Sequence, residues 1–169
     1  MSTAKNLRLK TATSAFDGDC LNVTAFPHEG AKMYTLDMDL GGRPLDWQVV
    51  SAAQVFRTLR SVSSAVEHLS LEYGRYHIST EWNNQADRTW WRELLGSFGN
   101  MKTLRVEYDL IVQLSRALQP GEGQSPTELL PELQEISYTT ITNAFSLDAF
   151  APFIDARQKA GRPVTLARL

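Results

Sequence analysis

A six-residue pattern of apolar positions recurs four times along the chain and constrains its fold more than any other feature. Each copy contains an apolar residue, two variable residues, a second apolar residue, one variable residue and a third apolar residue. The copies are Met33-Leu36-Met38, Val66-Leu69-Leu71, Met101-Leu104-Val106 and Leu133-Ile136-Tyr138. They begin 33, 35 and 32 residues apart, and a nearly fixed period of this size is typical of stacked structural repeats. Such stacks usually present binding surfaces, so the period also bears on function.

Helical patterns fill the intervals between these copies. Asp46 is the predicted N-cap of the first helix, and Gly161 is the predicted end of the last. The apolar residues at helical spacing are Val49, Ala52, Ala53, Phe56 and Leu59, then Trp91, Leu94, Leu95 and Phe98, then Ile111, Leu114 and Leu118, and finally Phe150, Phe153 and Ile154. Strands that are joined through helices run parallel, so the pattern predicts a parallel sheet.

The repeated strands alternate between apolar and polar residues. Leu36 and Met38 alternate with Asp37 and Asp39, and the later copies behave in the same way. A parallel sheet with one apolar face needs helices on that face only. The sequence therefore predicts an α/β fold in which a curved parallel sheet carries helices on one face. The polar face would meet water or a partner.

The N-terminal part lacks a helical pattern. Turn residues separate short strand-like segments, which predicts a β-meander with strands near 6–12, 20–26 and 32–40. Leu7 and Leu9 give a partial copy of the repeat at this end, and Val164 and Leu166 give another at the C-terminal end. We interpret residues 1–169 as one domain, with a capping meander over 1–40 and β-α repeats over 41–169.

Composition limits the classes of partner and compartment. The formal net charge is −2, which gives no basic surface for nucleic acid or for an anionic membrane. No apolar run approaches the ~20 residues of a membrane span, and the N-terminus lacks the apolar core of a secretion signal. Cys20 is the only cysteine, which fits a reducing compartment. We expect a cytoplasmic or nuclear protein that is a monomer or a weak oligomer.

No motif of catalysis, cofactor binding or metal binding stands out. His28, His68 and His77 are the only histidines, and none of their spacings matches a zinc site. The segment from Asp17 to Asp19 begins like a calcium loop but lacks the later ligands, so a turn is the preferred interpretation. We therefore predict a protein that is not an enzyme and that has no cofactor.

The polar row of the strands is the predicted protein-binding site. Its residues are Arg8, Asp37, Asp39, Ser70, Glu72, Arg105, Glu107, Ser137 and Thr139. The row mixes both signs of charge, and it could equally serve only for solubility through cross-strand charge pairs. Arg8 and Lys10 are expected to neutralise Asp37 and Asp39. A second hypothesis is a small-ligand protein or enzyme that uses Asp37, Asp39 and His68. Exposed Trp82 or Trp90 would mark a contact site, whereas burial under a loop would not.

The strand motif with a following helix resembles the leucine-rich repeat. More specifically, the chain resembles the C-terminal region of F-box and leucine-rich-repeat-type proteins of mushroom-forming fungi. The matching stretches are Leu45-Asp46-Trp47-Gln48-Val49, Ala65-Val66-Glu67-His68-Leu69, Glu81-Trp82-Asn83-Asn84, Trp91-Arg92-Glu93-Leu94-Leu95-Gly96-Ser97-Phe98, Glu128-Leu129-Leu130-Pro131-Glu132-Leu133-Gln134-Glu135 and Phe153-Ile154-Asp155-Ala156-Arg157. The resemblance implies repeats that hold a protein substrate. It brings no catalytic motif, and the helical module that binds the cullin-ligase adaptor is not expected in the strand-like first ~40 residues.

Overall fold

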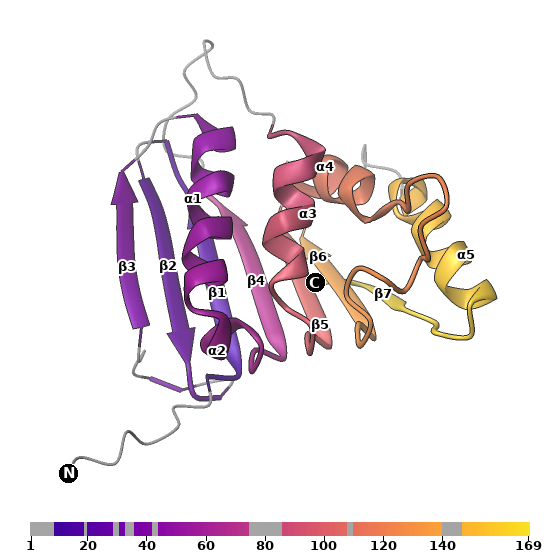
Figure 1. Ribbon diagram of the computed structural model, residues 1–169, viewed down its shortest axis with the longest axis horizontal. Coiled ribbons are helices and arrows are strands. Elements are labelled where there is room, and N and C mark those ends of the chain that lie inside the picture. Colours follow the sequence, from indigo (N-terminus) through magenta and orange to yellow (C-terminus); the bar gives the residue numbers. More distant parts are fainter. Residues whose placement is uncertain are drawn as a thin grey trace.

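The computed structural model describes residues 9–18, 20–28, 31–32, 36–41, 44–74, 86–107, 110–139 and 147–169. These residues form an α/β fold around a seven-stranded sheet of order β3-β2-β1-β4-β5-β6-β7 (Figure 1). The strands are β1 (Thr11–Phe16), β2 (Cys20–Phe26), β3 (Leu36–Gly41), β4 (His68–Tyr73), β5 (Thr103–Glu107), β6 (Glu135–Thr139) and β7 (Thr165–Arg168). The four pairs β1–β4, β4–β5, β5–β6 and β6–β7 are parallel, whereas β1–β2 and β2–β3 are antiparallel. The predicted α/β class, the mostly parallel sheet and the N-terminal meander are confirmed.

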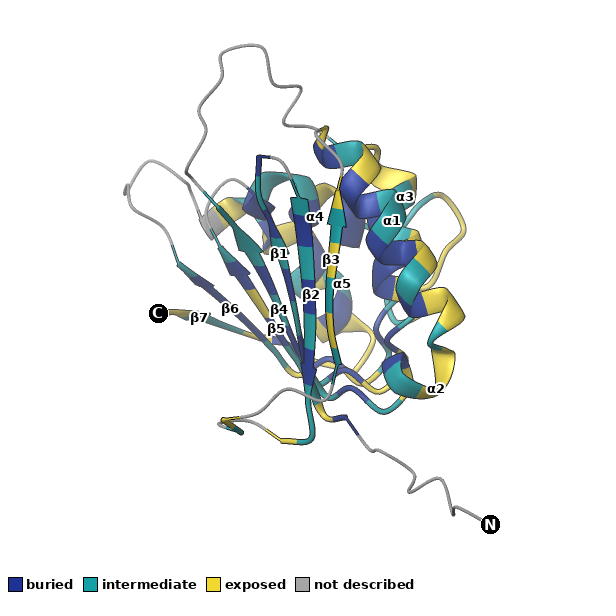
Figure 2. Ribbon diagram, turned by 90° about the vertical axis from the view of Figure 1, so that its left-hand side faces the viewer, coloured by how far each residue is buried: buried dark blue, intermediate teal, exposed yellow. Residues whose placement is uncertain are grey.

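The helices cover one face of the sheet and leave the other uncovered (Figure 2). They are α1 (Leu45–Thr58), α2 (Arg60–Ser63), α3 (Arg88–Gly96), α4 (Leu110–Leu118), the short 3-10 helix η1 (Leu147–Ala149) and α5 (Ala151–Lys159). The predicted apolar stripes face the sheet, because their members are buried with the exception of the half-buried Leu59 and Ile154. This one-sided arrangement follows from the alternation of the strands, which offers only one apolar surface to helices.

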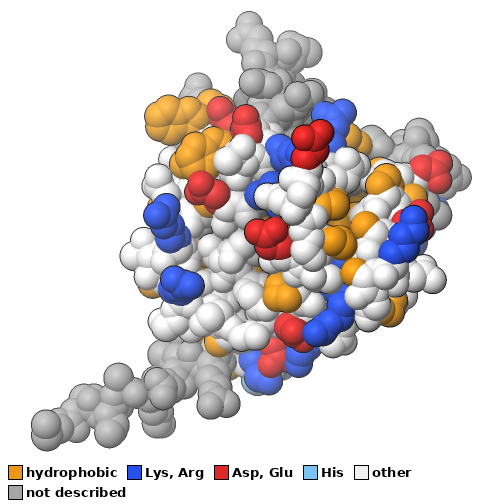
Figure 3. Space-filling view, turned by 45° about the vertical axis from the view of Figure 1, so that its right-hand side comes forward, with side chains coloured by type: hydrophobic (Ala, Val, Ile, Leu, Met, Phe, Trp, Pro, Cys, Tyr) orange, Lys and Arg blue, Asp and Glu red, His pale blue; other side chains and the backbone are white. Residues whose placement is uncertain are grey.

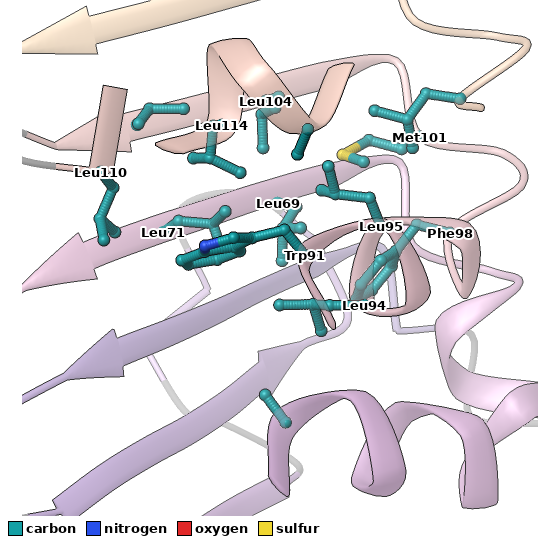
Figure 4. Close-up of a cluster of buried hydrophobic side chains, with 14 of the residues drawn as sticks. Leu69, Leu71, Trp91, Leu94, Leu95, Phe98, Met101, Leu104, Leu110 and Leu114 are labelled. Atoms are coloured by element: carbon teal, nitrogen blue, oxygen red, sulfur yellow. The ribbon is translucent and has the colours of Figure 1, made fainter. Parts of the chain in front are cut away.

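The core lies between the sheet and the helices, and its largest side chain is Trp91 (Figure 4). The Trp91 ring meets Phe16 edge to face at a centroid separation of 5.6 Å. Its Nε1 donates a hydrogen bond to Gln113 Oε1 at 3.0 Å. Gln113 Oε1 also accepts from the Ala86 amide at 2.9 Å. This side chain of α4 therefore fixes both the residues that precede α3 and its central tryptophan.

The stacking of the repeats is visible in the backbone at the N-terminal ends of the strands. The carbonyl of Lys10 accepts hydrogen bonds from the amides of Glu67 and His68, at 2.8 and 3.0 Å. The carbonyl of Glu67 accepts in the same way from Lys102 and Thr103, at 2.7 and 3.1 Å. The carbonyl of Lys102 accepts from Gln134 and Glu135, at 2.8 and 3.1 Å. The same local geometry therefore recurs in β1, β4, β5 and β6.

The first strand differs from its expected position. It covers 11–16 rather than 6–12, and residues 1–8 lie outside the described part of the chain. Thr11 pairs with His68, so Leu9, Ala12 and Ser14 occupy the repeat positions of Val66, Leu69 and Leu71. All three are buried against the helices. Small side chains at two of the three positions conceal this copy from a search for large apolar residues.

The copy that begins at Met33 is not a neighbour of the next copy. Its strand β3 lies at the sheet edge beside β2, and two strands separate it from β4. Its apparent period of 33 residues therefore reflects a helical crossover above β2 and β1, not adjacent stacking. The expected N-cap of the first helix was also wrong. The N-cap of α1 is Pro44, and the Asp46 carboxylate accepts from the Trp47 amide inside the first turn at 2.9 Å.

Candidate functional site

The face of the sheet opposite the helices, here the open face, is formed by the outward-pointing residues of the seven strands (Figure 2). Two rows cross its parallel part. One row contains Thr11, His68, Thr103, Glu135 and Thr165, and the next contains Thr13, Ser70, Arg105, Ser137 and Ala167. These residues are polar with the exception of alanine, so the face is built for contact with water or a polar partner.

A hollow of about 450 Å³ lies on the open face across β1, β4, β5 and β6. It is lined by Thr11, Thr13, His68, Leu69, Ser70, Glu72, Thr103, Arg105, Glu135, Ser137 and Leu169. The lining combines short hydroxyl side chains with three longer charged ones, Glu72, Arg105 and Glu135. A polar hollow of this size can admit a segment of another molecule.

The hollow brings together four of the predicted binding residues, namely Ser70, Glu72, Arg105 and Ser137. Glu107 and Thr139 are cross-strand neighbours farther along the same face. Asp37 and Asp39 also point outward, but they lie on the edge strand β3. Arg8 lies outside the described residues.

One ion pair joins the charged residues beside the hollow. Arg105 and Glu107 approach within 3.6 Å. Burial and the neighbouring Glu72 carboxylate raise the pKa of Glu107, while Arg105 and a hydrogen bond from the Tyr73 backbone oppose this effect. Ser70 donates a long hydrogen bond of 3.4 Å to Glu72. Arg105 is therefore paired with Glu107, and Glu72 has no ion pair within the described part of the chain.

The aspartates of β3 have a different partner from the one expected. Asn22 Nδ2 donates to Asp37 at 3.1 Å and to Asp39 at 2.8 Å, which bridges the two carboxylates. Lys10 does not neutralise them, because its Nζ pairs with Glu67 at 2.9 Å at the N-terminal end of the strands. The expectation for Lys10 was therefore wrong. Short asparagine reaches both aspartates because β2 is adjacent to β3.

His68 does not lie near the aspartates. It is on β4, three strands away from β3, and at about 4.8 Å per strand the separation is about 14 Å. His68 Nδ1 instead lies 2.6 Å from the Thr103 hydroxyl. No group of three or more His, Cys, Asp or Glu residues suited to a metal ion occurs among the described residues. The structure thus does not assemble the Asp37, Asp39 and His68 group of the second hypothesis.

One hydroxyl group of the hollow, that of Thr11, is buried without a protein partner. Thr11 Oγ1 neither accepts nor donates a hydrogen bond in the described structure. Ser137 is 7% exposed and also has no side-chain hydrogen bond within the described residues, but its oxygen is not fully shielded from solvent. A buried polar group without a partner costs about 1–3 kcal/mol. The Thr11 hydroxyl therefore points to a surface that is completed by another molecule.

Sequence reasoning missed several residues of the hollow. Thr11 and Thr13 were missed because the copy of the repeat on β1 was concealed. Thr103 and Glu135 are the first residues of their strands, and both align with His68 across the sheet. They occupy the second of the two variable positions between the first and second apolar residues of the pattern. That regular position was the signal that could have identified them.

The tryptophans, which could mark contact sites, differ in their exposure to solvent. Trp90 is half-buried and packs against the core, whereas Trp82 lies outside the described residues. Trp47 on α1 is 68% exposed, and the sequence had not distinguished it. The face of the molecule drawn in Figure 3 carries acidic and basic side chains interspersed with apolar ones.

A scan of protein-family models, a search of curated proteins and a search of solved structures each returned no match. Among the described residues, no helix is both long and apolar enough to cross a lipid bilayer.

Proposed function

We propose that the protein is a non-catalytic interaction module that binds another protein through the open face. The observation that carries this proposal is the hollow with the buried, partnerless hydroxyl of Thr11, on a sheet face that none of the described helices covers. A surface used only for solubility has no need to bury hydroxyl groups without partners. The resemblance to the substrate-holding repeats of F-box proteins supports the same direction.

An intracellular site of action, cytoplasmic or nuclear, belongs to this proposal because Cys20 is the only cysteine of the chain. The alternative function, a small-ligand protein or enzyme at Asp37 and Asp39, has weaker support. Both carboxylates already accept hydrogen bonds from Asn22, and they lie on the far edge from the hollow.

A photo-cross-linking experiment tests the proposal directly. A photoreactive amino acid is placed at position 70 on the open face, and a matched one at exposed position 54 on α1. Position 70 should capture a defined protein that position 54 does not capture. Glu72→Lys should abolish this adduct without changing the unfolding temperature. Equal capture from both positions would contradict the proposal.

A thermal-shift screen against metal ions and metabolites tests the alternative function. The interaction-module proposal predicts no specific shift that depends on the β3 aspartates. A large shift with one compound, lost in Asp37→Ala, would favour the small-ligand function instead.

A further inference from the structure

The open face carries more negative charge than the whole chain does. Five carboxylates point outward from its described strands, against the single guanidinium of Arg105; they belong to Asp37, Asp39, Glu72, Glu107 and Glu135. With histidine neutral, their formal sum is −4, whereas the whole chain carries −2. Acidic charge is therefore concentrated on this face, and the rest of the chain is slightly basic.

Two carboxylates at the hollow are without cationic partners. Glu72 and Glu135 both line it, and neither has an ion pair in the described part of the chain. Arg105 lies between their strands but is paired with Glu107. Acidic surface residues alone do not define a site. Here, however, they line the same hollow as Thr11, whose Oγ1 is buried without a hydrogen-bond partner among the described residues, and Ser137, which is only 7% exposed.

On this basis, and resting on the proposed function, we propose that the hollow binds an extended basic segment of a partner protein. The cationic side chains of the segment would pair with Glu72 and Glu135, and its backbone would hydrogen-bond to the hydroxyls of Thr11 and Ser137. Leu169, which is 61% exposed at the rim of the hollow, provides an apolar contact beside these groups. Charge complementarity of this kind steers association and fixes the register of the partner.

The sheet register sets the spacing of the cations. His68 aligns with Thr103 and Glu135 across β4, β5 and β6, and Glu72 lies farther along β4. With about 4.8 Å between strands and about 3.3 Å per residue, the α-carbons of Glu72 and Glu135 are about 16 Å apart. An extended peptide covers this diagonal in about five residues. Because successive side chains of an extended peptide point to opposite sides, the separation must be even, and the segment should carry its two basic residues four positions apart, with the length of the cationic side chains spanning the remainder.

Synthetic peptides of twelve residues test this inference by fluorescence anisotropy. The probe has arginines four positions apart in an uncharged background, and a control peptide has glutamates at those positions. Binding of the arginine peptide should weaken about tenfold in the double variant Glu72→Gln, Glu135→Gln, because two charge pairs are lost. The matched variant Glu93→Gln, Glu122→Gln removes the same charge from exposed positions elsewhere and should bind normally.

Other outcomes would overturn the inference. Unchanged binding in the Glu72 and Glu135 double variant, or equal binding of arginines placed two positions apart, would contradict the proposed geometry. Spermine binding as strongly as the peptide would show a site for free polycations instead of a protein segment. Failure of the peptide together with a specific adduct at position 70 would reject the basic segment and retain the interaction module. Loss of both would reject the module as well.

Discussion

The Glu67 carboxylate lies 2.7 Å from Lys102 Nζ, across the N-terminal ends of β4 and β5. Lys10 reaches the other oxygen of the same carboxylate at 2.9 Å. These residues occupy equivalent positions of successive repeats, just before each strand begins. The repeat thus places alternating charges in a line at this edge of the sheet.

The Glu67 pairs should make stability depend on acid pH. Hydrogen bonds from Lys102 and then Lys10 lower the pKa of Glu67 from 4.5 to about 2. Because the pKa is lower in the folded state, the contribution is complete above the unfolded pKa and disappears as pH falls toward 2. Urea unfolding from pH 6 to pH 2 should therefore show a smaller loss of stability in Glu67→Gln than in wild type. Parallel curves for the two proteins would contradict the assignment.

Arg157 should be essential for the C-terminal part of the core. Its side chain is fully buried, and it donates to the carbonyls of Leu130, Leu133 and Arg162 at 3.1, 2.9 and 3.1 Å. Arg157→Met would leave these carbonyls without donors in a buried region, at a cost of about 3 kcal/mol or more. Chemical denaturation measures this loss. The exposed Arg162→Met serves as a control and should cost less than about 1 kcal/mol.

Ser14 should be replaceable by alanine with a gain in stability. Its hydroxyl is buried in β1 on the helix side and has no hydrogen-bond partner among the described residues. Removing it should raise the free energy of unfolding by about 1 kcal/mol. Ser63 is the matched control, because its buried hydroxyl donates to the Phe56 carbonyl at 3.1 Å. Ser63→Ala should lower stability, so the two substitutions should have opposite signs in urea titrations.

Two adjacent tryptophans of α3 should differ in their importance. Trp91→Leu removes a fully buried ring and its hydrogen bond to Gln113, with an expected cost of about 3 kcal/mol. Trp90→Leu, at a half-buried position, should cost clearly less. Thermal unfolding monitored by circular dichroism compares them. Equal losses would show that the core around Trp91 has adapted to the smaller side chain.

The helices and the one-sided sheet were predictable because their signals are strong and local. Val49, Ala52 and Phe56 mark α1 at helical spacing, and strict alternation marks the face of each strand. The position of β1 was not predictable in the same way, since Ala12 and Ser14 are small and Ser14 is polar. The order of the strands in the sheet was also not predictable from the sequence. No feature of the sequence near Met33 indicates that β3 pairs with β2 rather than with β4.

The candidate site was predicted in part, for a related reason. Ser70, Glu72, Arg105 and Ser137 were found because they alternate with large apolar residues. Thr11 and Thr13 depended on the concealed copy and were missed. The bridging of Asp37 and Asp39 by Asn22 depends on strand pairing between residues distant in sequence. The pattern thus gave the orientation of the side chains but not their partners.

The crossover of α1 has a consequence for how the molecule assembles. Pairing within the meander, and pairing among β4, β5, β6 and β7, joins segments that are close in the chain. The β1–β4 pairing instead joins positions 11 and 68, so it closes the longest loop of the strand pairings and has the largest loop-closure entropy cost. We expect the two halves of the sheet to become ordered separately and to join last. Because the hollow spans β1 and β4, only the completely folded chain can present it, and ligand capture would report the final folding step.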